Sequence, residues 1–312
     1  MDNENQLTTP VAFFTFNRLS TTRQVFEVIR QARPRKLYLV SDGARARVAG
    51  EKEKVDEVRA YLESHIDWEC EVHKNYAEQN MGCGRRVSSG ISWVFDQEEE
   101  AIILEDDCLP DPTFFTYCQE MLAYYRDDER IMVIGGSNPA AYYGTKHDYL
   151  FTKVPFIWGW ASWRRAWKLY DFDIKTWEKE KKNPVFRKVL PLKSYWVYTA
   201  EFDALYRHSY DTWDYQLMYA TILHDKLNIV PRQSYTCNIG FQEESTHTSG
   251  ELKSVELRTG ACRFPIRHRE EVVWDEEFDR AYFKRTNGHG LIVKIKSILG
   301  LDVNRSVFER KR

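Results

Sequence analysis

The sequence predicts an α/β fold in which a mostly parallel sheet is flanked by helices. Over the first 135 residues, short apolar runs that end at polar residues alternate with amphipathic stretches of helical period. Parallel strands need crossover connections, and helices between the strands supply them. The chain has 312 residues, 43% of them apolar, which is enough to bury a large core. We expect one domain over residues 1–250 and a C-terminal extension over 251–312.

Each predicted element depends on a local pattern. The strand segments are apolar or alternating and are bounded by turn residues; they are 11–16, 36–40, 69–73, 101–104, 131–134 and 228–231. The helical segments have apolar residues at three- and four-residue spacing; they are 21–32, 55–62, 87–95, 112–125 and a stretch that begins at 211. Thr21 and Gln24 have the spacing of a capping box.

Two segments in the second half interrupt this alternation. Trp160, Trp163 and Trp167 are spaced like one face of a helix, which favours core packing. The charged span 175–193 contains Asn-Pro and Leu-Pro pairs, and we interpret it as an exposed insertion or loop.

Composition and targeting signals limit the possible partners. The net charge is −2, whereas nucleic-acid binders typically carry a large excess of positive charge. We therefore expect no nucleic-acid partner. The six cysteines include no C-x-x-C pair, which excludes a thiolate metal site of that spacing. Residues 1–6 are polar, with no signal-peptide core, so we expect a cytoplasmic protein. The basic amphipathic tail 291–301 either docks on the domain or makes peripheral contact with the inner face of a membrane.

The fourth predicted strand ends in three consecutive carboxylates, Glu105, Asp106 and Asp107. Such a triplet is costly to desolvate unless a cation is shared or water reaches it. Because side chains alternate along a strand, Glu105 and Asp107 should point to one side and Asp106 to the other. Carboxylate oxygens favour Mg²⁺ or Mn²⁺, which usually take their other ligands from water and substrate phosphates. A solvated acidic loop is the alternative interpretation.

Two other predicted strands also end at polar residues, Asn17-Arg18 and Asp42. Ligands of parallel sheets bind beyond the carboxyl ends of the strands, where these residues should converge with the triplet. Arg18 is the first candidate for a phosphate contact, and Arg85 and Arg86 are alternative candidates.

Asp214, which opens the predicted helix near residue 211, is the candidate general base for an attacking hydroxyl group. Acidic residues at a helix start are commonly caps, and that alternative stands for both Asp211 and Asp214.

In their order along the chain, these landmarks resemble the GT-A fold nucleotide-sugar glycosyltransferases, above all the N-acetylglucosaminyltransferase I type and its bacterial relatives. The matching segments are Phe16-Asn17-Arg18, Ser41-Asp42-Gly43, Ile103 to Asp107 with Asp111 to Phe115, Gly159-Trp160 with Arg164 to Trp167, Trp213-Asp214, and Ser245-Thr246-His247. The resemblance implies a Rossmann-like nucleotide- and metal-binding half over 10–135 and an acceptor and catalytic half over 136–250.

The resemblance also implies a reaction. A sugar would move with inversion from a nucleotide diphosphate, by the family's habit a UDP-sugar, to a hydroxyl of a glycan or lipid-linked acceptor in surface polysaccharide assembly. Arg18 would contact the diphosphate, Asp42 the nucleobase and Asp106 the ribose.

The remaining implied roles concern the metal and the reacting groups. Asp107 would be the direct ligand of Mn²⁺ or Mg²⁺, Glu105 would position the site, and Asp214 would be the general base. His247 would lie in the loop that closes over the donor. Tyr215 stands where the family has a second Asp, and His247 is one residue farther from Ser245. These departures affect the acceptor and the role of His247.

Other classes of protein stay open. A sugar-nucleotide nucleotidyltransferase shares the sheet and the metal acids, but it normally has a glycine-rich loop where this chain has Asn17-Arg18-Leu19-Ser20. A non-catalytic carbohydrate- or nucleotide-binding homologue would account for the many aromatic residues but not for acids at the end of a buried strand.

Overall fold

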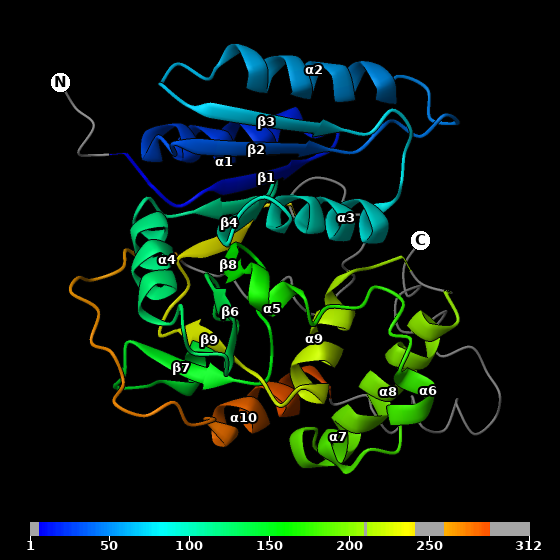
Figure 1. Cartoon of the computed structure of the whole chain (residues 1–312), viewed down its shortest axis with the longest axis vertical. Coiled ribbons are helices and arrows are strands. Elements are labelled where there is room, and N and C mark those ends of the chain that lie inside the picture. Colours follow the sequence, from blue (N-terminus) through cyan, green and yellow to red (C-terminus); the bar gives the residue numbers. More distant parts are fainter. Residues whose placement is uncertain (1–5, 209–210, 241–258, 288–312) are drawn as a thin grey trace.

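The computed structural model describes residues 6–208, 211–240 and 259–287 and is built on one large sheet (Figure 1). The strand order is β3-β2-β1-β4-β8-β6-β9-β7. The bounds are β1 Val11–Thr15, β2 Lys36–Ser41, β3 Glu71–Tyr76, β4 Glu100–Glu105, β6 Ile131–Gly135, β7 Tyr149–Thr152, β8 Trp160–Trp163 and β9 Leu227–Pro231. Only β7 and β8 run against the other strands of this sheet. The predicted α/β fold with a mostly parallel sheet is therefore confirmed.

Helices cover both faces of the sheet. The bounds are α1 Leu19–Ala32, α2 Glu51–Ser64, α3 Cys83–Phe95, α4 Thr113–Tyr124, α5 Arg164–Trp167, α6 Trp177–Glu180, α7 Pro184–Val189, α8 Leu192–Tyr206, α9 Asp214–Leu223 and α10 Glu276–Thr286, with a short 3₁₀ helix at Ala141–Tyr143. Adjacent residues of β1 show the two layers. Phe13 stacks on Phe26 of α1, with ring centroids 6.4 Å apart, whereas Phe14 lies against Gly90 of α3. Burial on both faces explains why β1 and β4 are continuous apolar runs.

The start of α1 differs from the predicted capping box. The helix begins at Leu19, and Thr21 and Thr22 both donate their hydroxyl groups to the carbonyl oxygen of Arg18, at 3.3 and 2.7 Å. Gln24 donates to the carbonyl oxygen of Ser20 at 3.2 Å. The capping-box prediction is wrong because these side chains bond back to the first turn.

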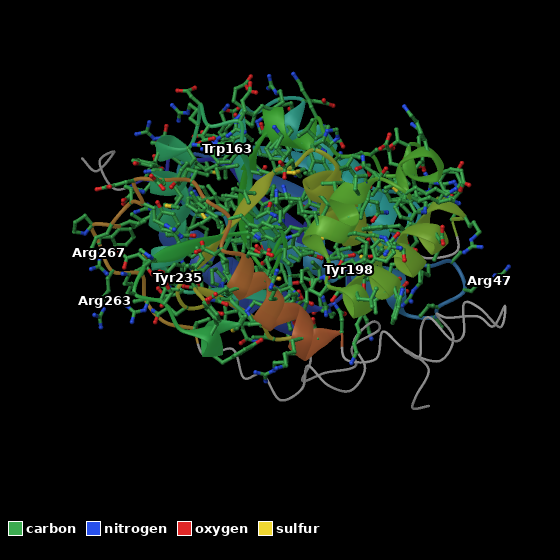
Figure 2. The ribbon with its side chains drawn as sticks, turned by 90° about the horizontal axis from the view of Figure 1, so that it is seen from below. Arg47, Trp163, Tyr198, Tyr235, Arg263 and Arg267 are labelled. Carbon is green, nitrogen blue, oxygen red and sulfur yellow. The ribbon has the colours of Figure 1, made fainter. Side chains whose placement is uncertain are left out.

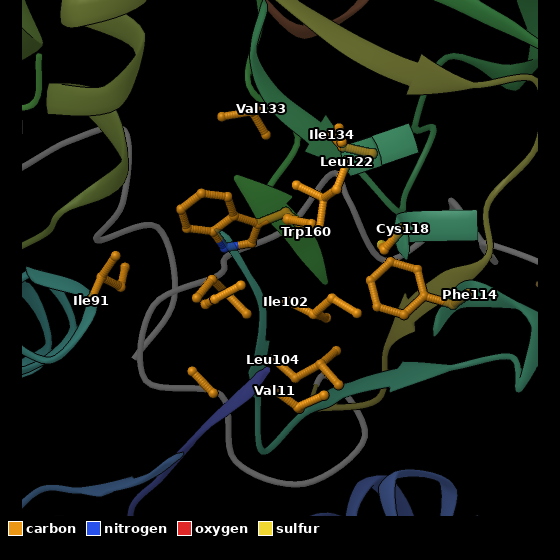
Figure 3. Packing of buried hydrophobic residues seen from close by; sticks show 14 of the residues in the cluster. Val11, Ile91, Ile102, Leu104, Phe114, Cys118, Leu122, Val133, Ile134 and Trp160 are labelled. Atoms are coloured by element: carbon orange, nitrogen blue, oxygen red, sulfur yellow. The ribbon is translucent and has the colours of Figure 1, made fainter. Parts of the chain in front are cut away.

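The tryptophan-rich segment is mainly a strand. Trp160 and Trp163 are the first and last residues of β8, which pairs antiparallel with β4 and β6. Of the three tryptophans, Trp167 alone lies in α5. All three rings are buried, so core packing is confirmed although the helical interpretation of their spacing is wrong. Trp160 packs among side chains that include Ile102, Val133 and Ile91 (Figure 3). A strand buried on both faces gives no alternation that would distinguish it from a buried helix.

The span 175–193 is not an exposed loop, because it forms α6 and α7 and builds a second hydrophobic cluster. The Trp177 ring lies 5.5 Å from Phe186 and 5.2 Å from Phe202 of α8, measured between ring centroids. Asn183 accepts a hydrogen bond from the Val185 amide and precedes a proline at the first position of α7. The predicted Asn-Pro break is thus a helix start.

The segment 259–287 returns to the domain and ends in α10, which contacts β7. The α10 carboxylate of Asp279 accepts hydrogen bonds from the Lys153 amide at 2.8 Å, from Trp274 Nε1 at 2.6 Å and from the Thr152 hydroxyl. Burial raises the pKa of Asp279 to about 6, although the hydrogen bonds from these donors act to lower it. The tail 291–301 lies outside the described residues. Within the described ranges, no helix has the length and apolar character needed to cross a bilayer.

The second cluster should contribute to the stability of the whole domain. Phe186 is fully buried in it, whereas Leu192 is 57% exposed. We expect Phe186→Ala to lower the free energy of unfolding by about 3–5 kcal/mol, since the truncation leaves a cavity. Leu192→Ala should change it by less than about 0.5 kcal/mol. Urea denaturation followed by circular dichroism measures both, and equal effects of the two changes would contradict this packing.

Candidate functional site

The acidic triplet lies where β4 ends. Glu105 is the last residue of β4, Asp106 and Asp107 form a turn, and the chain continues into β5 (Cys108–Pro110). Nη2 of Arg18 donates to Asp106 Oδ1 at 2.5 Å and to Asp107 Oδ2 at 3.0 Å. The predicted separation of Asp106 from Asp107 is therefore wrong, because the strand ends before strand alternation applies to them. Asp106 is only 3% exposed, so a solvated acidic loop is also wrong.

The Arg18 guanidinium offsets the charge of this corner. Burial raises the pKa of Glu105 to about 8, and the charges of Asp107 and Asp106 add to the shift. Burial also raises the pKa of Asp106 to about 6, although the positive charge of Arg18 acts in the opposite direction. Burial lowers the pKa of Arg18, but the charges and hydrogen bonds of Asp106 and Asp107 together raise it above its ordinary value. The corner thus holds more negative charge than one guanidinium neutralises, which favours binding of a further cation.

Sequence reasoning missed Gly240, which lies against the triplet. Strand β10 (Thr236–Asn238) pairs with β5 and brings the Ile239 amide within 2.8 Å of the Asp107 carbonyl oxygen. A Cβ atom at residue 240 would lie 2.7 Å from Asp107 Oδ2 and 2.9 Å from Arg18 Nη1. A side chain at this position would therefore require Asp107 and Arg18 to shift. One glycine after a short strand gives no signal of it in the sequence.

Asp42 lies at the same rim of the sheet, on the other side of β1. Its Oδ1 accepts from the Gly43 amide at 2.8 Å and the Met81 amide at 2.9 Å, and its Oδ2 accepts from Asn80 Nδ2 at 2.9 Å. Burial raises the pKa of Asp42, and the two amides oppose the shift. The Asp42 amide bonds to Thr15 at the end of β1, while the Phe16 amide donates to Asp106 Oδ2 at 3.1 Å. The predicted convergence of three strand ends is confirmed.

The two aspartates near residue 211 have different roles in the structure. Asp211 accepts from the Cys83 and Gly84 amides at 3.1 and 2.8 Å, so it caps α3. The interpretation of Asp211 as a cap of the helix near residue 211 is wrong, because Asp211 caps α3 instead and α9 has no side-chain cap bond. Asp214 begins α9 and accepts a hydrogen bond from the Thr212 hydroxyl at 2.5 Å. Its charge adds to the upward shift in the pKa of Glu105, after the larger effects of burial and of Asp107 and Asp106.

Arg85 and Arg86, the alternative candidates for a phosphate contact, contact other residues than those of the Arg18 bridge. Arg86 is buried and donates to the carbonyl and side-chain oxygens of Asn75. Arg85 is exposed, with its guanidinium carbon 5.1 Å from the centroid of the Phe172 ring. It lines a pocket of about 330 Å³ with Phe172, Asp211, Gln216 and others. A phosphate contact by Arg85 stays a prediction, and His247 lies outside the described residues.

Sequence reasoning also missed Glu201 of α8. It is 5% exposed, and its Oε2 has no hydrogen-bond partner within the part of the chain that the structure describes. Burial raises the pKa of Glu201 to about 7, and the charge of Asp214 adds to the shift. A signal was present, because Val197 and Leu205 stand four residues before and after it on the buried face of the helix.

The donor set fits a shared cation and not a resident metal cage. The described residues contain no group of three or more His, Cys, Asp or Glu side chains arranged to hold a metal ion. Asp107 Oδ2 contacts Arg18, and Oδ1 lies 3.5 Å from Cys108 Sγ. Mg²⁺ typically binds through one or two carboxylates together with substrate phosphates and water. Asp107 could supply such a ligand.

Comparisons with known proteins assign no family to the chain. No protein-family model and no curated protein matches it. One similar solved structure is a UDP-glucose pyrophosphorylase complexed with UDP-glucose, with a TM-score of 0.24 and 11% identity. The match covers 46% of this chain and 62% of that one. A likeness at this level is too low to assign an activity.

The raised pKa of Glu201 predicts a pH-dependent stability difference. Its ordinary value is 4.5 and its value in the folded protein is about 7, so its ionisation costs stability as the pH rises through that interval. Glu201→Gln removes this titration. We expect the variant to gain stability over the wild type between pH 4.5 and 7, reaching roughly 3 kcal/mol above that range. Urea denaturation across this pH range measures the difference.

Glu57→Gln is the matched control, because Glu57 is exposed on α2. Its stability profile should parallel that of the wild type at every pH. A parallel profile for Glu201→Gln would show that Glu201 is not buried as a charged group.

Proposed function

We propose that the protein is a metal-dependent, inverting glycosyltransferase that takes a sugar from a nucleotide diphosphate, with a UDP-sugar as the expected donor, and adds it to a hydroxyl group. The observation that carries this proposal is the Arg18 bridge to Asp106 and Asp107 at the carboxyl end of β4, together with the carboxylate of Asp214, whose charge acts on Glu105. It combines a cation for phosphates, an oxygen ligand for a metal and a separate carboxylate for proton transfer.

Donor binding would use the residues at the ends of β1, β2 and β4. The Arg18 side chain is 36% exposed and has five N–H donors, so it can contact a diphosphate while it holds the two carboxylates. Asp42 and Asp106 would contact the nucleobase and the ribose, because each carboxylate oxygen can accept more than one hydrogen bond. A Mn²⁺ or Mg²⁺ ion on Asp107 would stabilise the charge of the leaving nucleotide diphosphate.

Asp214 would act as the general base. Its carboxylate takes the proton of the acceptor hydroxyl while that oxygen bonds to the anomeric carbon and the bond to the diphosphate breaks. A single displacement of this kind inverts the anomeric configuration. The Thr212 hydroxyl bond holds one Asp214 oxygen in place. The setting in surface glycan assembly at the inner membrane face stays a prediction from the resemblance, as does the role of Glu105 in positioning the site.

The nucleotidyltransferase is the less favoured alternative. Helix α1 begins at Leu19, directly after Asn17 and Arg18, so the segment between β1 and α1 has no glycine-rich phosphate loop. That class also needs a nucleoside triphosphate and a sugar phosphate as substrates, which gives a direct experimental distinction.

Two substitutions should separate nucleotide binding from proton transfer. Asp214→Asn should lower the transfer or donor-hydrolysis rate by about 10²–10⁴-fold, because the general base is lost, and should leave the affinity for UDP nearly unchanged. Asp107→Ala should remove the Mn²⁺ dependence of UDP affinity. Calorimetry with UDP and a rate assay with a panel of UDP-sugars measure these effects. Asp127→Asn, on an exposed carboxylate, is the control. Equal loss of UDP affinity in the Asp107 and Asp214 variants would contradict the assigned roles.

Nucleotide binding itself is expected to depend on the metal. UDP at one hundred times its Kd should stabilise the protein by about 2.7 kcal/mol, which appears as a higher melting temperature. The shift should need Mn²⁺ and vanish with EDTA. A shift with UTP that exceeds the shift with UDP, together with pyrophosphate release on addition of a sugar 1-phosphate, would favour the nucleotidyltransferase.

A further inference from the structure

A pocket of about 440 Å³ lies beyond the end of β9 and contains none of the residues assigned above to the candidate site. Strand β9 runs parallel to β6, and both run parallel to β4, because β8 pairs antiparallel with β4 and with β6. The strand β9 therefore ends at the same rim of the sheet as β4, three strand spacings or roughly 14 Å along it. Ligands of parallel sheets bind at this rim. The pocket is lined by Asp148, Arg232, Gln233, Tyr235, Ala261 and Arg263.

Hydrogen bonds between two segments that are remote in the sequence fix the walls of this pocket. The Gly260 amide donates to the Ser234 carbonyl oxygen at 2.9 Å, and Gln233 Nε2 donates to the Ala261 carbonyl oxygen at 3.0 Å. Tyr235, which is 5% exposed, provides a buried aromatic surface on the inner side. The segment after β9 and the segment that begins at residue 259 are thus held together around the pocket.

The pocket has more positive than negative side chains. Its carboxylate, Asp148, is bound by Arg267: Oδ1 accepts from Nη2 at 2.7 Å, and Oδ2 accepts from Nε at 3.1 Å and from the Arg267 amide at 2.9 Å. Arg232 and Arg263 are exposed, and neither guanidinium forms an ion pair or a hydrogen bond with any residue of the ranges 6–208, 211–240 and 259–287. Figure 2 shows Tyr235, Arg263 and Arg267 at one end of the molecule. Two positive charges thus border the pocket without a carboxylate of their own.

The charge and the size of the pocket favour a phosphate monoester as its ligand. Guanidinium groups bind phosphate oxygens through paired N–H donors. A phosphate monoester carries about −1.5 to −2 charges at pH 7, which matches two arginines, whereas a carboxylate carries a single charge. A pocket of about 440 Å³ has the size of a small-molecule site, so it has room for the organic group that carries the phosphate.

We propose that Arg232 and Arg263 bind a phosphate monoester, with the phosphate at the two guanidinium groups and the organic group against Tyr235. A soluble sugar phosphate and the headgroup of phosphatidic acid share this chemistry, and the experiment below distinguishes these two sources. The site is separate from the Arg18 bridge, so the proposal goes beyond the proposed function and does not depend on it.

Two probes test the proposal on the full-length protein, both in EDTA so that no metal ion can bridge phosphate to Asp107. In the first arm, α-D-glucose 1-phosphate is titrated into the protein, with glucose as the uncharged control, and calorimetry gives the dissociation constants. In the second arm, the protein is sedimented with phosphatidylcholine vesicles that contain phosphatidic acid, with vesicles of phosphatidylcholine alone as the control. We expect at least one of the two phosphate monoesters to bind and its control to show no binding.

Substitutions assign the binding to the pocket. Arg232→Gln and Arg263→Gln each remove one charge from an exposed position, so the fold should be kept. Each should weaken binding of the probe at least about tenfold, because a charge-assisted hydrogen bond is lost. Arg47→Gln, on an exposed arginine at the opposite end of the molecule in Figure 2, should bind the probe like the wild type. UDP affinity should not change in the Arg232 and Arg263 variants.

The outcomes separate the two sources and the two proposals. Binding of glucose 1-phosphate that both pocket substitutions weaken supports a soluble ester, and sedimentation with phosphatidic acid that both weaken supports a lipid headgroup. If neither probe binds the wild type, or if binding is equal in the wild type and both variants, the pocket is not a phosphate site. Failure of UDP and Mn²⁺ to bind the wild type would count against the proposed function alone.

Discussion

The contact of Arg18 with two adjacent carboxylates is the interaction on which the candidate site depends. The acids stand at the end of a strand buried on both faces, where unpaired negative charge is costly. The pairing register of β1 with β4 brings Arg18 to these acids as their partner. Strand β1 pairs parallel with β4, with Phe14 opposite Glu105, so the residues that follow each strand meet at one corner. Arg18 reaches Asp106 and Asp107 because this pairing sets where both chains leave the sheet.

A second constraint joins the two halves of the domain. Asp211 caps α3 in the first half, and three residues later Asp214 begins α9 in the second half. A cap usually comes from the residue next to its helix, whereas this one comes from a residue more than one hundred positions away. The hydrogen bonds of Asp211 therefore hold the segment before α9 against the start of α3.

Local pattern predicted the elements whose environment is uniform. Strands β1, β2, β4, β6 and β9 and the convergence of Arg18, Asp42 and the triplet followed from apolar runs and from the rule that parallel strands end at one rim. The local pattern gave wrong predictions for segments whose structure is determined by tertiary contacts. The strand that contains Trp160 is buried on both faces and shows no period of two, and Trp177 and Phe186 make a charged span into part of a core.

The site residues that sequence reasoning missed share one cause. Gly240 matters because β10 brings it against Asp107, and Glu201 matters because α8 buries its carboxyl group. Neither relation is local in the sequence. The helical period predicts that Glu201 is buried, but it does not predict which side chains surround it. The alternation expected for Glu105 to Asp107 failed because β4 ends at Glu105, and Asp106 and Asp107 form a turn in which both contact Arg18.

The central claim is that a divalent cation and a nucleotide diphosphate bind together at the end of β4. The most direct measurement is the anomalous scattering of manganese in crystals grown with Mn²⁺ and UDP. The account predicts one manganese peak in bonding distance of an Asp107 oxygen, with the diphosphate on the same ion and beside Arg18. A peak at another place with this corner empty, or UDP bound at the opposite rim of the sheet, would contradict it.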